Sequence, residues 1–591
     1  MANHREKKIL VVFEKRFPVN CVKKGNFSTI VGDEVFKETV ESFGCTFVEL
    51  RTLVDHGSLY KSGNLIDELS KITLSNGTRI TKSFVYKGYE LWWLHYNSLF
   101  YFFCVPYMRY KRLLERLKDF HEIYLYDVPH KTLFSYYLKS YSRYVRILPE
   151  SRFGSLKVIP LGIFIQIVLT LLSLIILVVT RRSVLVFIGD KFEKDKDYDY
   201  RMKFVYKELR GRDIPFVEFI RSLESWRTVL QNALTRKRPV IYSGAIAFVA
   251  RFFSTISDQC TDLKSELNKH SLSLADKPEE MFKFLMATHY FLNTSDDVWA
   301  IRIMKFILRL IGVKAAFITA ALDRNFHTVF GCKLNGIPTV GIMHGVPSRY
   351  STPYDYLTGF DGEKMLSVDT YGVWSEWWRT QYIEKSNAYN PEQLHVSGPM
   401  RPLVIQNQTG VNPSTYSGSL RVLFIAEQLS VPEEVIPYLL KLMERTDIKL
   451  TIKFRPFRDG FEGWLLKNEP GILKQSRMQI VKGNMQDAIR TADVVVGCHS
   501  TAVLEALLQL KVPIFLRTQK WGDYYNMSES SERLCFLASD PKELIERIKQ
   551  ASSIDPELLR NLREQYFGDL YKNGSKWVVD RLEKILETKK K

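Results

Sequence analysis

The chain has 591 residues and a formal net charge of +19 at pH 7, and 46% of its residues are hydrophobic and 25% charged. This composition excludes a disordered or fibrous chain and leaves room for several globular domains. The seven cysteines include no Cys-x-x-Cys pair, so we expect neither a zinc site nor a disulfide framework. No nucleic-acid-binding motif is present, so the positive charge favours an anionic membrane surface or a phosphorylated substrate over nucleic acid.

The first 150 residues alternate strand-like and helix-like patterns, which predicts an N-terminal α/β region at 1–150. The N-terminal run ILVVF is expected to be its first strand and not a signal peptide. The sequence leaves open whether this region is a separate domain or an extension of the next one. Strands are predicted at 9–13, 45–50, 123–127 and 144–148, and helices at about 92–119 and 130–140.

Residues 158–180, VIPLGIFIQIVLTLLSLIILVVT, carry no charge and are long enough to cross a hydrocarbon core about 30 Å thick. Lysines and arginines flank the segment on both sides, so the positive-inside rule sets no orientation. We therefore expect 151–182 to be a membrane-associated helix, monotopic or re-entrant in preference to a single crossing, with the soluble parts facing the cytoplasm. A basic cluster at 109–118 could bind anionic head groups, and it fits a solvated helix face equally well.

Two further runs of alternating strands and helices follow, and they predict parallel sheets that helices cover on both faces. The Ser-rich stretch NPSTYSGS at 412–419 is the expected linker, which gives one domain at 183–411 and another at 412–591. The predicted strands are 184–189, 214–220, 239–244, 315–320, 339–345, 370–375 and 394–398, then 421–427, 450–456, 478–483, 493–497 and 512–516.

Polar residues collect where the strands of the last domain end, and ligands of open parallel sheets bind beyond these carboxyl ends. Ser500 and Thr501 come directly before a helical pattern, so their N–H groups and hydroxyls would lie at a helix N-terminus, which favours anions. The alternative for both residues is an ordinary helix cap. The candidate donor-binding residues are Glu427, Lys453, Arg455, Gly497, Ser500, Thr501 and Glu505.

We expect other candidates of this group to contact different parts of a bound nucleoside diphosphate. Lys453 and Arg455 could supply counter-charge to the diphosphate. Gly497 would let the backbone approach the ligand closely. Glu505, one turn into the helix, could reach a ribose hydroxyl pair, although a purely structural role fits it at least as well.

The run DVVVGCHSTAVLEALLQLKVPIFL at 493–516 resembles the donor-binding motif of GT-B glycosyltransferases. Residues 314–347, KAAFITAALDRNFHTVFGCKLNGIPTVGIMHGVP, resemble the acceptor domain of bacterial capsule and surface-polysaccharide transferases and of CDP-glycerol glycerophosphotransferase relatives. YGVWSEWW at 371–378 and LHVSGPMRP at 394–402 are similar to the interdomain region of those enzymes. The resemblance implies an α/β fold of the GT-B type, with two Rossmann-like domains facing across a cleft and the donor nucleotide on the last domain.

The resemblance places the pair His344 and Gly345 in the cleft. His344 could then be the general base for an acceptor hydroxyl, because an imidazole titrates near neutral pH, or it could donate a hydrogen bond to a phosphate or hydroxyl. Asp323, just beyond another predicted strand, is the rival base, since carboxylates often fill this role in inverting transferases. His327 and Arg349 are bystanders or acceptor contacts. The alternatives are a loop histidine for His344 and a helix cap for Asp323.

A metal-dependent transferase would need an Asp-x-Asp motif at a strand end. The stretch EKDKDYDYR at 193–201 contains this pattern, but its many charges fit a solvated loop or a helix cap better. Basic side chains and a helix end could stabilise the leaving diphosphate instead. We therefore expect no metal and no cofactor beyond the nucleotide-activated donor.

These features favour a membrane-associated, metal-independent glycosyltransferase. Its expected partners are a nucleotide-sugar donor, a surface glycan or lipid-linked acceptor, and membrane lipids. A glycerophosphotransferase of the CDP-glycerol type, a UDP-sugar 2-epimerase of the same fold and a catalytically inactive binding protein are the alternatives. Relatives with CMP-activated donors tend to have His-Pro where this chain has Arg455-Pro456, which disfavours CMP-sialic acid as donor.

Overall fold

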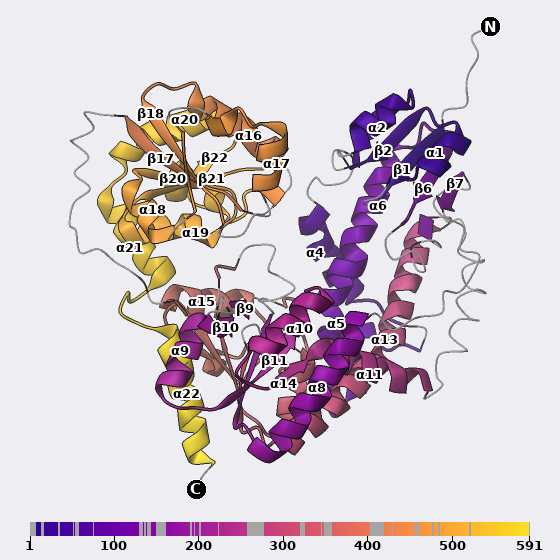
Figure 1. The fold of residues 1–591 in the computed structure, drawn as a ribbon, viewed down its shortest axis with the longest axis vertical. Coiled ribbons are helices and arrows are strands. Elements are labelled where there is room, and N and C mark those ends of the chain that lie inside the picture. The colour runs from indigo at the N-terminus through magenta and orange to yellow at the C-terminus, as the bar shows by residue number, and fades with distance from the viewer. Residues whose placement is uncertain are drawn as a thin grey trace.

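The computed structural model shows three α/β units, with the N-terminal and last units lying above the central one in the view of Figure 1. The prediction of an α/β fold with parallel sheets is confirmed. The structure describes residues 8–13, 17–33, 36–50, 53, 58–74, 76–128, 134, 137–138, 144–148, 161–189, 192–193, 196–199, 202–222, 224–256, 277–318, 326–343, 345–347, 357–401, 403, 419–427, 430–455, 460–474, 478–482, 485–518 and 522–589.

The N-terminal unit contains a five-stranded parallel sheet in the order β3-β2-β1-β6-β7. Alternate residues of β1 point into two different cores: Leu10 and Val12 into a small one of this unit, and Ile9 and Val11 into the main core of the molecule. The strands are β1 (Lys8–Val12), β2 (Thr29–Gly32), β3 (Thr46–Glu49), β6 (Glu122–Tyr126) and β7 (Val145–Leu148), and the helices around them include α1 (Val19–Gly25), α2 (Lys37–Ser42) and α4 (Ser58–Leu69).

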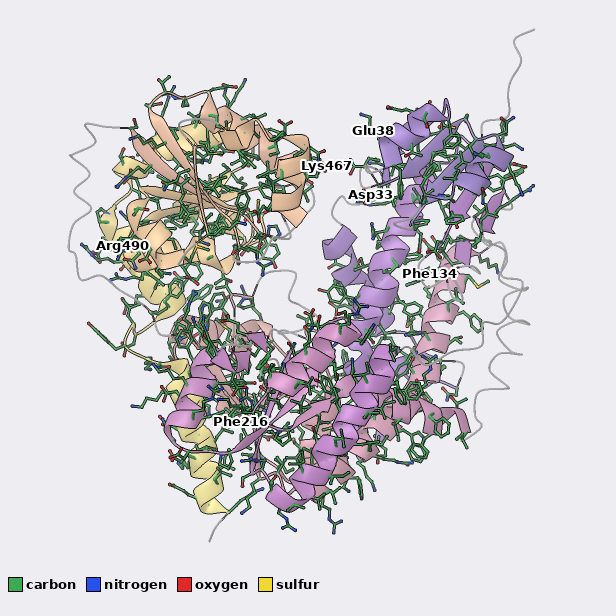
Figure 2. All side chains as sticks on the ribbon, viewed as in Figure 1. Asp33, Glu38, Phe134, Phe216, Lys467 and Arg490 are labelled. Carbon is green, nitrogen blue, oxygen red and sulfur yellow. The ribbon has the colours of Figure 1, made fainter. Side chains whose placement is uncertain are left out.

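The central unit contains a seven-stranded parallel sheet in the order β12-β11-β8-β13-β14-β15-β16. Figure 2 marks Phe216, a buried residue at the start of β11. The strands are β8 (Val184–Gly189), β11 (Phe216–Arg221), β12 (Val240–Tyr242), β13 (Ala315–Ile318), β14 (Thr339–Ile342), β15 (Thr370–Val373) and β16 (Leu394–Val396). The helices are α8 (Leu161–Thr180), α9 (Lys203–Gly211), α10 (Trp226–Thr235), α11 (Ser243–Ile256), α13 (Pro278–Ile311), α14 (Phe326–Lys333) and α15 (Glu376–Lys385).

The last unit contains a six-stranded parallel sheet in the order β19-β18-β17-β20-β21-β22. Its strands are β17 (Leu420–Ile425), β18 (Ile448–Lys453), β19 (Met478–Val481), β20 (Val494–Gly497), β21 (Val512–Leu516) and β22 (Leu537–Ala538). Its helices are α16 (Pro432–Met443), α17 (Gly460–Asn468), α18 (Met485–Thr491), α19 (Thr501–Leu504), α20 (Pro541–Gln550) and α21 (Pro556–Phe567). The predicted boundaries at 150 and 411 lie outside the described residues.

The three sheets share one strand order. In each, the first strand lies inside the sheet, with the second strand of that sheet on one side of it. The fourth strand of the same sheet, in chain order, pairs with its other side: β6 with β1, β13 with β8, and β20 with β17. Neighbouring loops leave such a pair of strands in opposite directions, which opens a crevice at the carboxyl ends. The strand order therefore indicates where a ligand crevice can form in each sheet, at the carboxyl ends of this pair of strands.

The N-terminal unit is joined to the central one by a long helix. The predicted helix at 92–119 is present as α5 (Trp92–Leu99), a π-helical turn at Phe100–Cys104 and α6 (Val105–Arg116). Pro106 lacks an N–H group, and the widened turn before it accommodates the missing bond. Aromatic side chains of this helix pack on α13, with the rings of Tyr107 and Phe282 stacked 3.8 Å apart. The unit thus has its own sheet and also shares the main core.

Helix α8 packs against the central sheet and covers its edge strand. Polar residues of its inner face accept hydrogen bonds from β12: Thr170 Oγ1 from Tyr242 N at 3.1 Å, and Ser173 Oγ from Val240 N at 3.2 Å. These two amides would otherwise be unpaired at the sheet edge. Gly244 leaves room for the next polar residue, because a Cβ there would lie 2.3 Å from Gln166 Oε1.

The outer face of α8 remains apolar and exposed. The helix is long and apolar enough to cross a membrane, and only 22% of its most apolar window is buried. The exposed large apolar residues of α8 are Leu161, Phe164, Val168, Leu171, Leu172, Ile175, Ile176, Val178 and Val179.

The last helix, α22 (Gly574–Thr588), belongs to the central sheet and not to the last unit in which the sequence analysis placed it. Val578, Val579 and Leu582 are buried in the core around β8, β13 and β14. Arg212 of the central unit pairs with Asp580 at 2.6 Å. An amphipathic pattern is local to the helix and does not specify which sheet the apolar face will meet.

We predict that Thr170→Val will destabilise the sheet edge by about 1–3 kcal/mol, because the buried amide of Tyr242 loses its acceptor while the shape is kept. The measurement is hydrogen exchange of the peptide that carries Tyr242, which should be faster in the variant. Thr180→Val is the matched control, since Thr180 is exposed and bonds only within α8. Equal exchange in both variants would contradict the capping role.

Candidate functional site

The carboxyl edges of the central and last sheets meet at one point. The loop after β14 reaches the residues after β20, and Val346 N lies 3.4 Å from Thr501 Oγ1. A Cβ on Gly345 would lie 3.6 Å from the same oxygen. Two of the predicted site residues, Gly345 and Thr501, are therefore brought together from opposite units.

The helix that follows β20 is shorter than the sequence pattern predicts. It has four α-helical residues, Thr501–Leu504, and continues as a 3₁₀ helix at Glu505–Gln509. Ser500 caps it, with its Oγ accepting from Ala502 N at 3.3 Å. A single α-turn aligns few peptide dipoles, so the attraction for an anion at this end is weaker than expected. The cap described as the alternative for Ser500 is present.

His499, which the sequence analysis left without a role, lies at the switch point of the last sheet. Its Nε2 is 2.9 Å from Oε1 of Glu427, and these residues follow the adjacent strands β20 and β17. His499 is buried, its ring lies 5.2 Å from that of Tyr524, and Tyr525 donates a hydrogen bond to its carbonyl at 3.1 Å. Its position directly after an apolar strand was the available signal.

The two predicted cations at the end of β18 differ in their surroundings. Lys453 is buried, and its Nζ donates to the carbonyl of Phe454 at 2.7 Å. Burial lowers the pKa of Lys453 from its ordinary value of 10.5. Arg455 is exposed. A buried ammonium beside the switch point is an unfavourable arrangement that a bound anion would relieve.

Gly497 has a packing role that the sequence analysis did not anticipate. A Cβ on this residue would lie 2.5 Å from Cγ2 of Val503 and 3.3 Å from the carbonyl of Ile425. The glycine lets the short helix lie close to the strand, and it is buried at the end of β20. The absence of a side chain at Gly497 is thus needed for the packing of the short helix on β20, independently of any ligand.

Glu505 forms part of the contact between the segment that leaves the central sheet and the last unit. Its Oε1 forms an ion pair with Arg401, which follows the central sheet, and its Oε2 accepts from Gln486 at 2.7 Å. The carboxylate is buried. These bonds match the structural alternative for Glu505, while a ribose contact stays a prediction.

Three residues predicted on the central side, His344, Asp323 and Arg349, lie outside the described residues. Asp323 follows β13, whose carboxyl end is the switch point of the central sheet, and His344 follows β14. Their roles as general base and acceptor contact stay predictions.

A buried carboxylate between two histidines is the main polar feature of the central unit near this edge. Asp297 of α13 forms an ion pair with His95 of α5, and its Oδ1 lies 2.6 Å from Nε2 of His327, the second residue of α14. Burial opposes ionisation, but the two histidines hold the pKa of the Asp297 carboxyl below its usual range. The His327 side chain is 26% exposed, so Asp297 holds the imidazole through Nε2 while part of the ring stays accessible to solvent.

In the Asp-x-Asp segment, the carboxylate of Asp197 is paired with two arginines. Asp197 is buried, and its Oδ2 lies 3.0 Å from Arg238 and 3.2 Å from Arg210. The expectation of a solvated loop is therefore wrong for Asp197, whereas Asp195 lies outside the described residues. Within the described part of the chain, no group of three His, Cys, Asp or Glu residues is arranged to hold a metal ion.

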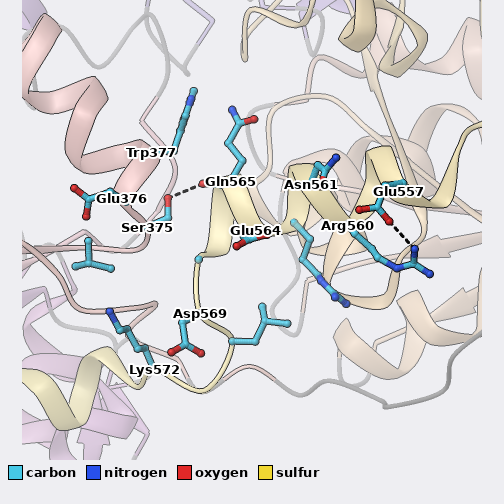
Figure 3. Close-up of a pocket in the computed structure, with 14 residues that line it drawn as sticks. Ser375, Glu376, Trp377, Glu557, Arg560, Asn561, Glu564, Gln565, Asp569 and Lys572 are labelled. Atoms are coloured by element: carbon cyan, nitrogen blue, oxygen red, sulfur yellow. Dashed lines mark hydrogen bonds and ion pairs between the residues drawn. The ribbon is translucent and has the colours of Figure 1, made fainter.

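A pocket of about 660 Å³ lies elsewhere, between the start of α15 and the end of α21 (Figure 3). Ser375 donates to the carbonyl of Gln565 at 2.6 Å, and Arg560 donates to Glu557 at 2.8 Å. Its walls carry side chains of both signs, and none of the predicted site residues lines it. We place it at the joint where the chain returns to the central unit, and not at the functional site.

No protein-family model matches the chain, and no curated protein matches it. Solved structures similar to it include sugar-nucleotide epimerases and glycosyltransferases. The S. aureus MnaA–UDP structure is 13% identical over 69% of this chain and 97% of its own, with a TM-score of 0.38. A UDP-GlcNAc 2-epimerase from Neisseria meningitidis is 11% identical over 68% and 99%, with a TM-score of 0.37. A calicheamicin glycosyltransferase is 12% identical over 69% and 99%, with a TM-score of 0.40.

We predict that Gly497→Ala will lower stability by about 1–3 kcal/mol, because its Cβ would overlap Val503. Adding Val503→Ala should remove most of this penalty, so the double variant should unfold at nearly the temperature of Val503→Ala alone. Gly471→Ala, where an added Cβ meets nothing within 4 Å, is the control. A penalty that persists in the double variant would contradict the packing role.

We predict that Lys453→Met will raise the unfolding temperature and weaken the binding of a nucleoside diphosphate. The lowered pKa means that the charged lysine costs stability at neutral pH, and this cost falls as the pH rises toward 10.5. Removing it should therefore stabilise the free protein. Lys449→Met, at an exposed position near the start of the same strand, should change neither property. Unchanged affinity in Lys453→Met would show that Lys453 takes no part in diphosphate binding.

Proposed function

We propose that the protein is a membrane-associated glycosyltransferase of the GT-B type that moves a sugar from a nucleotide-activated donor to a surface glycan or lipid-linked acceptor. The observation that carries this proposal is the contact of two parallel sheets through their carboxyl edges, where Gly345 and Val346 meet Thr501. Each of these sheets has the strand order that creates a ligand crevice at that edge. A donor on one edge and an acceptor on the other would face each other.

The donor would bind at the switch point of the last sheet. Glu427 and His499 follow the two strands that flank it, Lys453 is the last residue of the neighbouring strand β18, and Arg455 follows that strand. Cations placed there would stabilise the negative charge that grows on the leaving diphosphate.

The reaction needs a base on the central edge. The acceptor hydroxyl oxygen forms a bond to the anomeric carbon, the bond from that carbon to the diphosphate oxygen breaks, and the base takes the hydroxyl proton. His344 and Asp323 remain the proposed bases from the sequence. His327 is a third candidate, because Asp297 orients its imidazole as a carboxylate orients the base in other acyl- and glycosyl-transfer sites.

Association with the cytoplasmic side of a membrane would bring the enzyme to a lipid-linked acceptor. The positive net charge and the exposed apolar face of α8 support this part of the proposal. A UDP-sugar 2-epimerase is the second candidate, since the same paired sheets would serve it, and it would require no acceptor and no membrane.

The deciding experiment incubates the full chain with a panel of UDP-, GDP-, TDP- and CMP-sugars and measures free nucleotide, with and without a membrane lipid extract. We expect release from one donor to depend on the extract. His344→Ala, Asp323→Asn or His327→Gln should lower the rate by about 100-fold for the residue that acts as base. His121→Gln, an exposed histidine of the N-terminal unit, is the control. A donor sugar that is interconverted without any acceptor would identify an epimerase, and a protein that binds none of the donors would overturn the proposal.

A further inference from the structure

Three neighbouring helices of the central unit present apolar side chains to the outside. Helix α8 packs against both α10 and α11, and Figure 1 shows the three together on one side of the unit. On α8, Leu171 is 56% and Ile175 67% exposed, and on α11, Phe252 is 56% and Ile256 63% exposed. Leu234 of α10 is 77% exposed. Large apolar side chains are therefore exposed on three adjacent elements, and exposed apolar surface of this kind marks an interaction site.

The charges that these three helices carry all have one sign. Helices α8, α10 and α11 contain no aspartate or glutamate, and their only charged residues are Arg227 and Arg251. Arg181 and Arg182 follow directly after α8. Arg227, Arg251 and Arg181 are exposed. Glu224, just before α10, and Asp296 of α13, beside Arg251, are the acidic neighbours of this face, so cations outnumber them along the three helices. An apolar face with an excess of cations complements anionic lipid head groups above an acyl layer, and it complements a second copy of itself less well, because the arginines would then repel.

The hydrogen bonds of α8 decide how the helix can meet a bilayer. Its inner face is bound to the amides of Tyr242 and Val240 along β12. A helix that crosses the membrane alone would leave these sheet-edge donors unpaired, and carrying the sheet with it would place charged strands and loops in hydrocarbon. Only the outer face is therefore available to lipid.

We infer that the exposed faces of α8, α10 and α11 form one surface that lies on an anionic bilayer, with α8 parallel to the membrane plane and not across it. This deepens the membrane association within the proposed function and rests on that function for the nature of the acceptor. The two ends of α8 then have different roles. Arg181 and Arg182 anchor the C-terminal end at the head groups.

The N-terminal end of α8 lies near the edge that holds the proposed site. Gly162 approaches Trp226, the first residue of α10, which follows the carboxyl end of β11: a Cβ on Gly162 would lie 3.8 Å from Trp226 Cβ. Trp226 is 38% exposed. Tryptophan favours the boundary between head groups and acyl chains. The carboxyl edge of the central sheet would thus open at the level of the head groups, where the reactive end of a lipid-linked acceptor resides.

The test is sedimentation of the full chain with vesicles of phosphatidylcholine alone and of two parts phosphatidylcholine to one part phosphatidylglycerol. We expect binding to the anionic vesicles, and a decrease of at least about tenfold in L171E/I175E, because two carboxylates would enter the apolar layer. The matched control is L440E/L466E, which changes two exposed leucines of the last unit and should bind as the unaltered chain does. Circular dichroism of both variants checks that they fold.

Two further arms distinguish the alternatives. Arg181→Gln with Arg251→Gln should weaken binding to anionic vesicles and make it less sensitive to salt. Full binding by L171E/I175E would overturn the inference, and so would a dimer of the unaltered chain that L171E/I175E converts to a monomer without vesicle binding. Protection of the N-terminal unit from protease on the side of the membrane opposite to the last unit would show that α8 crosses.

The proposed function can fail independently of this surface. Donor binding by L171E/I175E without vesicles should equal that of the unaltered chain, since the changed residues lie on the outer face of α8. Vesicle binding with no donor bound would leave the surface standing and overturn the transferase. Donor binding with no vesicle binding would overturn the membrane surface and leave the transferase proposal standing.

Discussion

The arrangement of the molecule depends on the chain crossing twice between the central and last sheets at one joint. The outward crossing follows β16, the return crossing leads into α22, and Gly574 N donates to the carbonyl of Pro399 at 2.9 Å where they meet. Gly398 has a positive φ of 74°, and a Cβ there would lie 2.6 Å from Lys572, so the two crossings can pass this closely only at a glycine. Because both crossings are held together, the two carboxyl edges are kept facing each other.

Parallel topology explains why polar and charged groups gather at those edges. Each sheet reverses its strand order once, and the loops that part there leave space at the strand ends. In the last sheet this space is bordered by His499, Glu427 and a lysine whose pKa is lowered by burial. Groups of this kind are costly in a folded chain unless partners or ligands compensate them, and the cost is a reason to associate the place with function.

Helix α8 meets two requirements that oppose each other. The outer strand of the central sheet needs hydrogen-bond acceptors, which Thr170 and Ser173 provide from a helix that is otherwise almost entirely apolar. The same apolar composition leaves the outer face unsuited to water. In a water-soluble domain the apolar face of a helix usually points inward, and the exposed apolar face of α8 is the observation on which the proposed membrane surface rests.

The sequence by itself determined the α/β class, most of the strands and the apolar helix, because strand and helix periodicity are local properties of the chain. It also located the polar strand ends, including the run from Gly497 to Thr501. Only the tertiary structure decided which groups meet: His499 with Glu427, Glu505 with Arg401, and the last helix with the central sheet. These contacts join residues far apart in the chain, and an amphipathic face or a buried histidine carries no local mark of its partner. The role of the polar residues in α8 also depends on the tertiary structure. Thr170 and Ser173 are hydrogen-bond acceptors for β12 only because α8 lies along the open edge of the sheet.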